Sequence, residues 1–73
     1  MIKPAQLRAA RALLGWSQPD LARASLVSRP TIARIELGGK PYDRTLVDLI
    51  RAFEEAGIEF IGETGVNLKE PGK

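Results

Sequence analysis

Apolar residues recur at helical spacing in two stretches of the chain. In residues 4–14, four apolar side chains fall on one helical face, and Gly15 follows as a residue that ends helices. In residues 44–56, apolar side chains follow the i, i+3, i+4, i+7 spacing of a helix that faces a core. This pattern predicts two helices, the second capped by Asp43 and ended by Gly57.

Between these two helices the sequence repeats a phrase. SQPDLARA begins at residue 17 and SRPTIARI at residue 28, with Ser, Pro, Ala and Arg at matching places. In each copy a Ser precedes an apolar periodic segment, and Pro falls in the first turn, where backbone N–H groups have no intrahelical partner. Each copy therefore predicts a helix start, with Ser17 and Ser28 as N-caps. Because the first helix must end near Ala24, the two form a helix-turn-helix.

The end of the chain changes period. Apolar residues roughly alternate in residues 58–61 and 66–68 around a GETG turn, which predicts a β-hairpin, and the final KEPGK is expected to fray. A lone hairpin is marginal in water, so its apolar face either folds onto the protein's own helices or pairs with a second copy. We favour the second copy. The residues assigned to this dimer interface are Ile58, Phe60, Ile61, Val66 and Leu68.

Together the elements predict an all-α fold, a compact four-helix helix-turn-helix domain with a short C-terminal β-hairpin. The DNA-binding domain is assigned to residues 1–57. The hairpin and tail, assigned as a dimerisation element, occupy residues 58–73.

Composition excludes several kinds of chemistry. The chain has no Cys and no His, so it lacks thiolate sites, the commonest general base and the commonest metal ligand. We therefore expect no enzyme activity, no metal and no cofactor. No apolar run approaches the ~20 residues of a membrane span, so no membrane partner is expected.

Charge is unevenly distributed along the chain. Residues 1–44 carry eight basic and three acidic side chains, a net charge of +5, whereas residues 45–73 carry three basic and six acidic ones, a net charge of −3. The first part suits a polyanion such as DNA, and the second part does not.

The second copy of the repeated phrase has an outward surface of a distinctive kind. Its two isoleucines face the core, which turns two arginines and two small residues away from it. Such a surface fits a major groove about 12 Å wide, and Arg can grip guanine with two hydrogen bonds. The outward residues are Arg29, Pro30, Ala33 and Arg34.

The segments QLRAARALLGWSQPDLA and VSRPTIARIELG, within residues 6–56, resemble the phage-repressor-like (Xre/Cro-type) helix-turn-helix family. The resemblance covers about two thirds of the chain. It implies a lambda-repressor-like fold and sequence-specific binding of double-stranded DNA by a transcriptional regulator. It also implies a cytoplasmic, nucleoid-associated protein of bacterial, phage or mobile-element origin.

The resemblance also implies roles for individual residues. It assigns base reading to Arg29, Pro30, Thr31, Ala33 and Arg34. It assigns phosphate contacts to Gln18, Lys40 and Arg44, and a structural ion pair to Arg11 and Glu36. The residues themselves agree on the last point: Glu36 falls on the core-facing side of its helix, and a buried acid needs a partner.

Two residues depart from the family pattern. Leu26 stands in the turn where the family usually has Gly, and at a positive φ a Leu would cost about 1–2 kcal/mol. Pro30 stands where many members carry a polar base reader, so Arg29 and Arg34 would hold most of the direct readout.

These observations favour a dimeric repressor that binds an inverted-repeat operator. Two alternatives stay open. One is an antitoxin or antagonist that binds DNA and, through its acidic C-terminal part, a protein partner. The other is an interaction module that has lost DNA binding, which strongly salt-dependent binding to duplex DNA would exclude.

Overall fold

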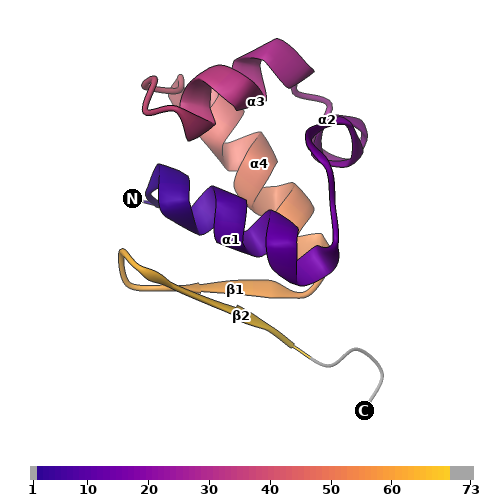
Figure 1. Cartoon of the computed structure of the whole chain (residues 1–73), viewed down its shortest axis with the longest axis vertical. Coiled ribbons are helices and arrows are strands. Elements are labelled where there is room, and N and C mark those ends of the chain that lie inside the picture. Colours follow the sequence, from indigo (N-terminus) through magenta and orange to yellow (C-terminus); the bar gives the residue numbers. More distant parts are fainter. Residues whose placement is uncertain (1, 70–73) are drawn as a thin grey trace.

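The structure, a computed structural model, describes residues 2–69, and across them the chain forms four helices followed by a two-stranded antiparallel sheet (Figure 1). The elements are α1 (Pro4–Leu14), α2 (Gln18–Ser25), α3 (Arg29–Glu36), α4 (Asp43–Glu55), β1 (Ile58–Ile61) and β2 (Gly65–Leu68). This architecture confirms the predicted four-helix domain with a C-terminal hairpin. No helix within residues 2–69 is long and apolar enough to span a membrane.

The core lies where the four helices meet β1. Phe53 of α4 is fully buried, stacks on Trp16 and meets Phe60 edge-on, with ring centroids 5.8 Å apart in both pairs. The buried apolar residues are Leu7, Ala10, Leu21, Val27, Ile32, Ile35, Leu49, Ala52, Phe53 and Ile58. Because aromatic pairs stabilise beyond the area they bury, this stack joins the α1–α2 connection, α4 and the hairpin in one core.

Both copies of the repeated phrase begin a helix, as predicted. The Ser17 hydroxyl accepts a hydrogen bond from the Asp20 N–H (3.1 Å), and the Asp20 carboxylate accepts one from the Ser17 N–H (2.9 Å). This is a reciprocal capping box. The Ser28 hydroxyl accepts from the Thr31 N–H (3.3 Å). The hydrogen bond from the Ser17 backbone favours the charged carboxylate and lowers the pKa of Asp20.

Helix α4 begins differently from the sequence prediction. Tyr42 occupies the N-cap position, no side chain caps this end, and Asp43 is the first helical residue. The assignment of Asp43 as the cap is therefore wrong. Tyr42 keeps an extended backbone (φ −67°, ψ 153°), so the helix starts at Asp43, one residue earlier than a cap at Asp43 requires. The Asp43 carboxylate still lies in the first turn, where the helix dipole favours an acid.

The hairpin presents one apolar face to the helices. Ile58 pairs with Leu68 and Phe60 with Val66, so these four side chains share a face. Ile58 is buried in the core, and Phe60 and Val66 pack against it. The hairpin therefore folds onto the protein's own helices.

A buried amide fixes the hairpin turn to α1. Gln6, which is 1% exposed, donates through Nε2 to the carbonyls of Gly62 (3.1 Å) and Gly65 (3.0 Å). At the other end of the hairpin, the Lys69 N–H donates to the Gly57 carbonyl (2.8 Å). The remainder of the KEPGK segment, residues 70–73, lies outside the described residues.

Candidate nucleic-acid interface

The turn between α2 and α3 contains Leu26 in the left-handed conformation (φ 65°, ψ 21°). The side chain of Leu26 is 86% exposed, so it gains little by packing. Next to it, the buried Ser25 hydroxyl donates to the Leu21 carbonyl (2.7 Å) and accepts from the Val27 N–H (3.2 Å). These bonds hold the chain on both sides of Leu26, so the strained backbone is imposed by its neighbours.

Helix α3 buries one face in the core and exposes the other face to solvent. Ile32 and Ile35 are 1% and 2% exposed. Of the residues expected to read bases, Arg29, Pro30 and Arg34 are exposed, and Thr31 and Ala33 are half-buried. The Thr31 hydroxyl accepts from the Ser28 hydroxyl (2.8 Å), so it is shared with the helix cap. The resulting surface combines two exposed arginines with small side chains on a helix, which is the form that enters a major groove.

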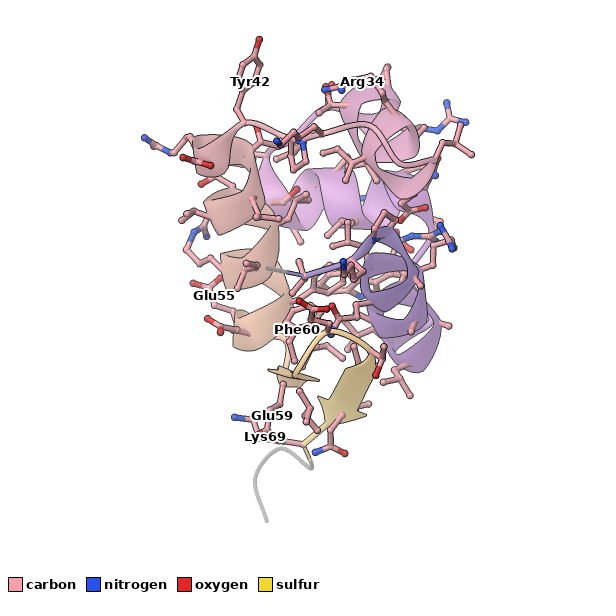
Figure 2. All side chains as sticks on the ribbon, turned by 90° about the vertical axis from the view of Figure 1, so that its left-hand side faces the viewer. Arg34, Tyr42, Glu55, Glu59, Phe60 and Lys69 are labelled. Carbon is pink, nitrogen blue, oxygen red and sulfur yellow. The ribbon has the colours of Figure 1, made fainter. Side chains whose placement is uncertain are left out.

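The loop after α3 folds back against the end of α3. The Arg34 guanidinium donates to the Lys40 carbonyl (3.4 Å), and the Gly39 N–H donates to the Arg34 carbonyl (2.9 Å). Figure 2 shows Arg34 and Tyr42 at one end of the molecule, opposite the hairpin. Lys40 and Arg44, the expected phosphate contacts, are both exposed in or next to this loop.

Tyr42 is an exposed aromatic residue next to these basic side chains. Its side chain is 81% exposed, and it lies two residues from Lys40 and two from Arg44. Arg44 also lies 3.6 Å from Asp48 through Nε, an exposed i,i+4 pair that adds little stability, and its guanidinium retains further N–H donors for a phosphate.

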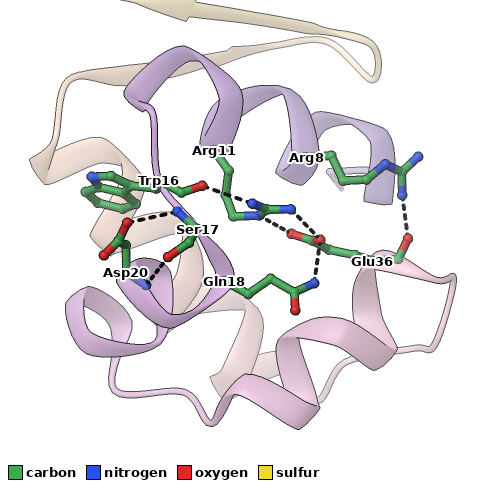
Figure 3. Close-up of polar contacts among 7 residues, drawn as sticks. All are labelled: Arg8, Arg11, Trp16, Ser17, Gln18, Asp20 and Glu36. Carbon is green, nitrogen blue, oxygen red and sulfur yellow. Dashed lines mark hydrogen bonds and ion pairs between the residues drawn. The ribbon is translucent and has the colours of Figure 1, made fainter.

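A polar network joins α1, α2 and α3 (Figure 3). Arg11 and Glu36 form a bidentate ion pair, with Nε–Oε2 at 2.7 Å and Nη2–Oε1 at 2.9 Å. Glu36 Oε1 also accepts from Gln18 Nε2 (3.1 Å), and Arg11 Nη1 donates to the Trp16 carbonyl (2.9 Å). Arg8 Nη1 donates to the Glu36 carbonyl. Within residues 2–69, every fully buried side-chain nitrogen and oxygen has a hydrogen-bond partner.

The network keeps Glu36 charged although it is 5% exposed. Burial alone would raise the pKa of Glu36. The hydrogen bonds from Arg11 and Gln18, with the charges of Arg11 and Arg8, outweigh burial and hold that pKa below its ordinary value. The hydrogen bond to Glu36 likewise raises the pKa of Arg11. Both members of the pair are therefore ionised at neutral pH.

A hollow of about 660 Å³ opens beside this network. It is lined by Pro4, Arg8, Gln18, Ala33, Glu36, Leu37 and Gly38. Two expected DNA contacts, Gln18 and Ala33, therefore border the same space as Arg8. Sequence reasoning missed Arg8, although its i, i+3 spacing from Arg11 places both on one side of α1.

The residues assigned to a dimer interface have different surroundings. Ile58 is 1% exposed and presents no surface to a second copy, whereas Ile61 and Leu68 are 54% and 37% exposed. Phe60 and Val66 are half-buried against the core. Figure 1 shows the hairpin at the end of the molecule opposite α3, so a partner bound there would leave α3 accessible.

A four-helix domain with a capped helix-turn-helix and an exposed basic recognition helix defines a class of DNA-binding proteins. Comparison with known families agrees: the helix-turn-helix family model HTH_3 matches residues 7–60. The chain belongs to the helix-turn-helix family of the phage-repressor (Xre/Cro) type, whose members are DNA-binding transcription regulators. No curated protein matches the chain.

Proposed function

We propose that this regulator is a repressor that reads a specific duplex sequence through α3 and acts in the cytoplasm on the nucleoid. The observation that carries the proposal is the outward surface of α3, where exposed Arg29 and Arg34 accompany Pro30 and Ala33. Each Arg that grips a guanine with two hydrogen bonds discriminates by about 1–3 kcal/mol, and Pro30 offers an apolar contact to a thymine methyl. Repression then follows from occupying the operator and excluding polymerase.

Backbone contacts would set the register of α3 in the groove. Gln18, Lys40 and Arg44 supply donors to phosphates on either side of the recognition helix. Such contacts position the protein without reading sequence, and the ionic ones make binding depend on salt.

The DNA-binding proposal is tested by fluorescence anisotropy on random-sequence duplex DNA at several salt concentrations. We expect salt-dependent binding that Arg34→Ala weakens. The matched control is Arg51→Ala, because Arg51 is also exposed but lies on α4 beside Asp48 and Glu55. Folded protein that binds no duplex even at low salt would contradict the proposal.

We further propose that the operator is an inverted repeat bound by a homodimer. In such dimers the half-site centres lie about one helical turn apart. The hairpin supplies the exposed Ile61, on the face opposite the one that packs against the helices, for a two-fold interface. Deletion of the hairpin is a poor test because Ile58 belongs to the core. Ile61→Glu is better: sedimentation should show a monomer, and a variant that still sediments as a dimer would exclude this interface.

The alternative role as an antagonist of a second protein rests on a separate observation. The half of the molecule that includes the hairpin carries four exposed acids, namely Glu54, Glu55, Glu59 and Glu63. A basic protein partner could bind there while α3 holds DNA. Co-purification of a basic protein with the wild type, lost in Glu59→Lys, would favour this role over a free-standing repressor.

A further inference from the structure

Glu36 accepts more hydrogen bonds than an ion pair with Arg11 requires. Its carboxylate also accepts a hydrogen bond from Gln18 Nε2 (3.1 Å), and its backbone carbonyl accepts one from Arg8 Nη1. Figure 3 shows these donors approaching Glu36 from α1 and α2. The last residue of the recognition helix therefore holds side chains from two other helices in place.

Gln18 and Arg8 both retain donors for a ligand. Among residues 2–69, Glu36 is the one hydrogen-bond acceptor of Gln18 Nε2, which carries two N–H groups. The Arg8 guanidinium carries five N–H groups and gives one bond, to the Glu36 carbonyl. Both side chains line the hollow of about 660 Å³, so their remaining N–H groups have an open space beside them.

The charge around this hollow suits an anion. Arg8 and Glu36 are the charged residues that line it. The Glu36 carboxylate is already paired with Arg11, so the positive charge of Arg8 is left without a carboxylate partner at the hollow. Ala33, at a base-facing position of α3, lines the same hollow. A DNA phosphate beside a base read by α3 would therefore lie within reach of these donors, which are of the kinds that bind phosphates.

We propose that Glu36 is a positioning residue that aims Gln18 and Arg8 at one phosphate of the DNA backbone in this hollow. The inference rests on the proposed function, because it requires α3 to lie in the major groove. It assigns Arg8 to the interface, and it makes the end of the recognition helix the support of a backbone contact. The helix that reads the bases, α3, then also holds the side chains that contact the phosphate.

The test is a double-mutant cycle in duplex affinity, with Gln18→Ala, Glu36→Gln and the double variant. Charge alone predicts that Glu36→Gln tightens binding, because it removes a negative charge near DNA. Positioning predicts the opposite sign, a weakening of about tenfold like that of Gln18→Ala. It also predicts that the double variant binds no more than about twofold more weakly than Gln18→Ala alone.

The matched control is Glu63→Gln, which changes the net charge equally on an exposed side chain at the hairpin end. It should leave affinity unchanged or slightly tighter. Additive losses in the cycle, or tighter binding by Glu36→Gln, would overturn the positioning role. Wild-type protein that binds no duplex would overturn the proposed function as well, so the two failures are distinguishable.

Glu36→Gln also breaks the pair with Arg11, and circular dichroism decides whether this variant folds. If it does not, ¹⁵N relaxation of the Gln18 side-chain amide in DNA-free wild type takes its place. Positioning predicts an ordered amide with an order parameter above about 0.6, and a lower value overturns it.

The assignment of Arg8 is tested by the salt dependence of binding. Arg8→Gln should reduce the slope of log affinity against log salt by about 0.9, the contribution of one phosphate contact. Arg51→Gln, with the same charge change on α4, should leave the slope unchanged. An unaltered slope in Arg8→Gln would remove Arg8 from the interface.

Discussion

Replacing Leu26 by glycine should stabilise the protein. Leu26 has a left-handed backbone (φ 65°), and its side chain is 86% exposed. An ordinary L-residue in that conformation costs about 1–2 kcal/mol, which glycine does not incur. The exposed side chain contributes little burial, so the substitution removes strain and loses few contacts.

The magnitude follows from two opposing terms. Relief of strain raises the free energy of unfolding by about 1–2 kcal/mol, and the greater freedom of glycine in the unfolded chain lowers it by about 0.4–1 kcal/mol. We therefore expect Leu26→Gly to gain about 0–1.6 kcal/mol, with a central value of about 0.8 kcal/mol, which corresponds to a rise of about 3–6 °C in Tm for a domain of this size. Leu26→Asn should gain at least as much, because Asn tolerates this conformation without the entropy of glycine.

The assay is urea unfolding followed by the fluorescence of Trp16, the single Trp of the chain, which stacks on the buried Phe53. The control is Ala12→Gly, at an exposed position within α1, where glycine should destabilise by up to about 1 kcal/mol. If Leu26→Gly lowers the free energy of unfolding as much as Ala12→Gly does, the backbone at Leu26 is not strained.

Three further predictions concern stability. Glu36→Ala strands the largely buried Arg11 and should cost about 3–5 kcal/mol in denaturant melts, and a loss under about 1 kcal/mol would show that the pair contributes little. Gly39→Ala places a Cβ 2.8 Å from the Arg34 carbonyl oxygen and should cost about 1–3 kcal/mol, so an unchanged Tm would contradict the crowding. The pKa values of Asp20 and Glu36 are lower in the folded protein than in the unfolded chain, where they are about 3.9 and 4.3. The stability that these carboxylates contribute is therefore present above the unfolded pKa values and is lost as pH falls through the folded ones. A urea midpoint that increases as pH is lowered from about 5 to 2 would contradict this.

The helix starts could be predicted from the sequence because their signals are local. Ser17 and Ser28 cap their helices through groups within three residues, so the SxPx phrases carry the information themselves. The hairpin also follows from alternation, and its register pairs Phe60 with Val66 on the face that the pattern assigns. The family's glycine at the place of Leu26 leaves two possibilities open, a strained turn or a different turn geometry, and the φ of 65° shows the strained turn.

Features set by tertiary contacts could not be predicted. The cap of α4 depends on where the chain enters that helix, and Tyr42 rather than Asp43 takes the position. The bond from Arg8 to the Glu36 carbonyl joins residues 28 apart in sequence, which no local pattern encodes. The exposure of Tyr42 likewise depends on how the loop after α3 lies.

Selection of binding sites from a random duplex pool near physiological salt, with Arg34→Ala as the control, shows whether α3 reads a DNA sequence. We expect the wild type to enrich an inverted repeat with half-site centres about one helical turn apart. We expect Arg34→Ala to lose this enrichment while remaining folded. A folded wild-type protein that enriches no sequence, or a variant that enriches the same repeat equally well, would contradict the claim that α3 reads DNA.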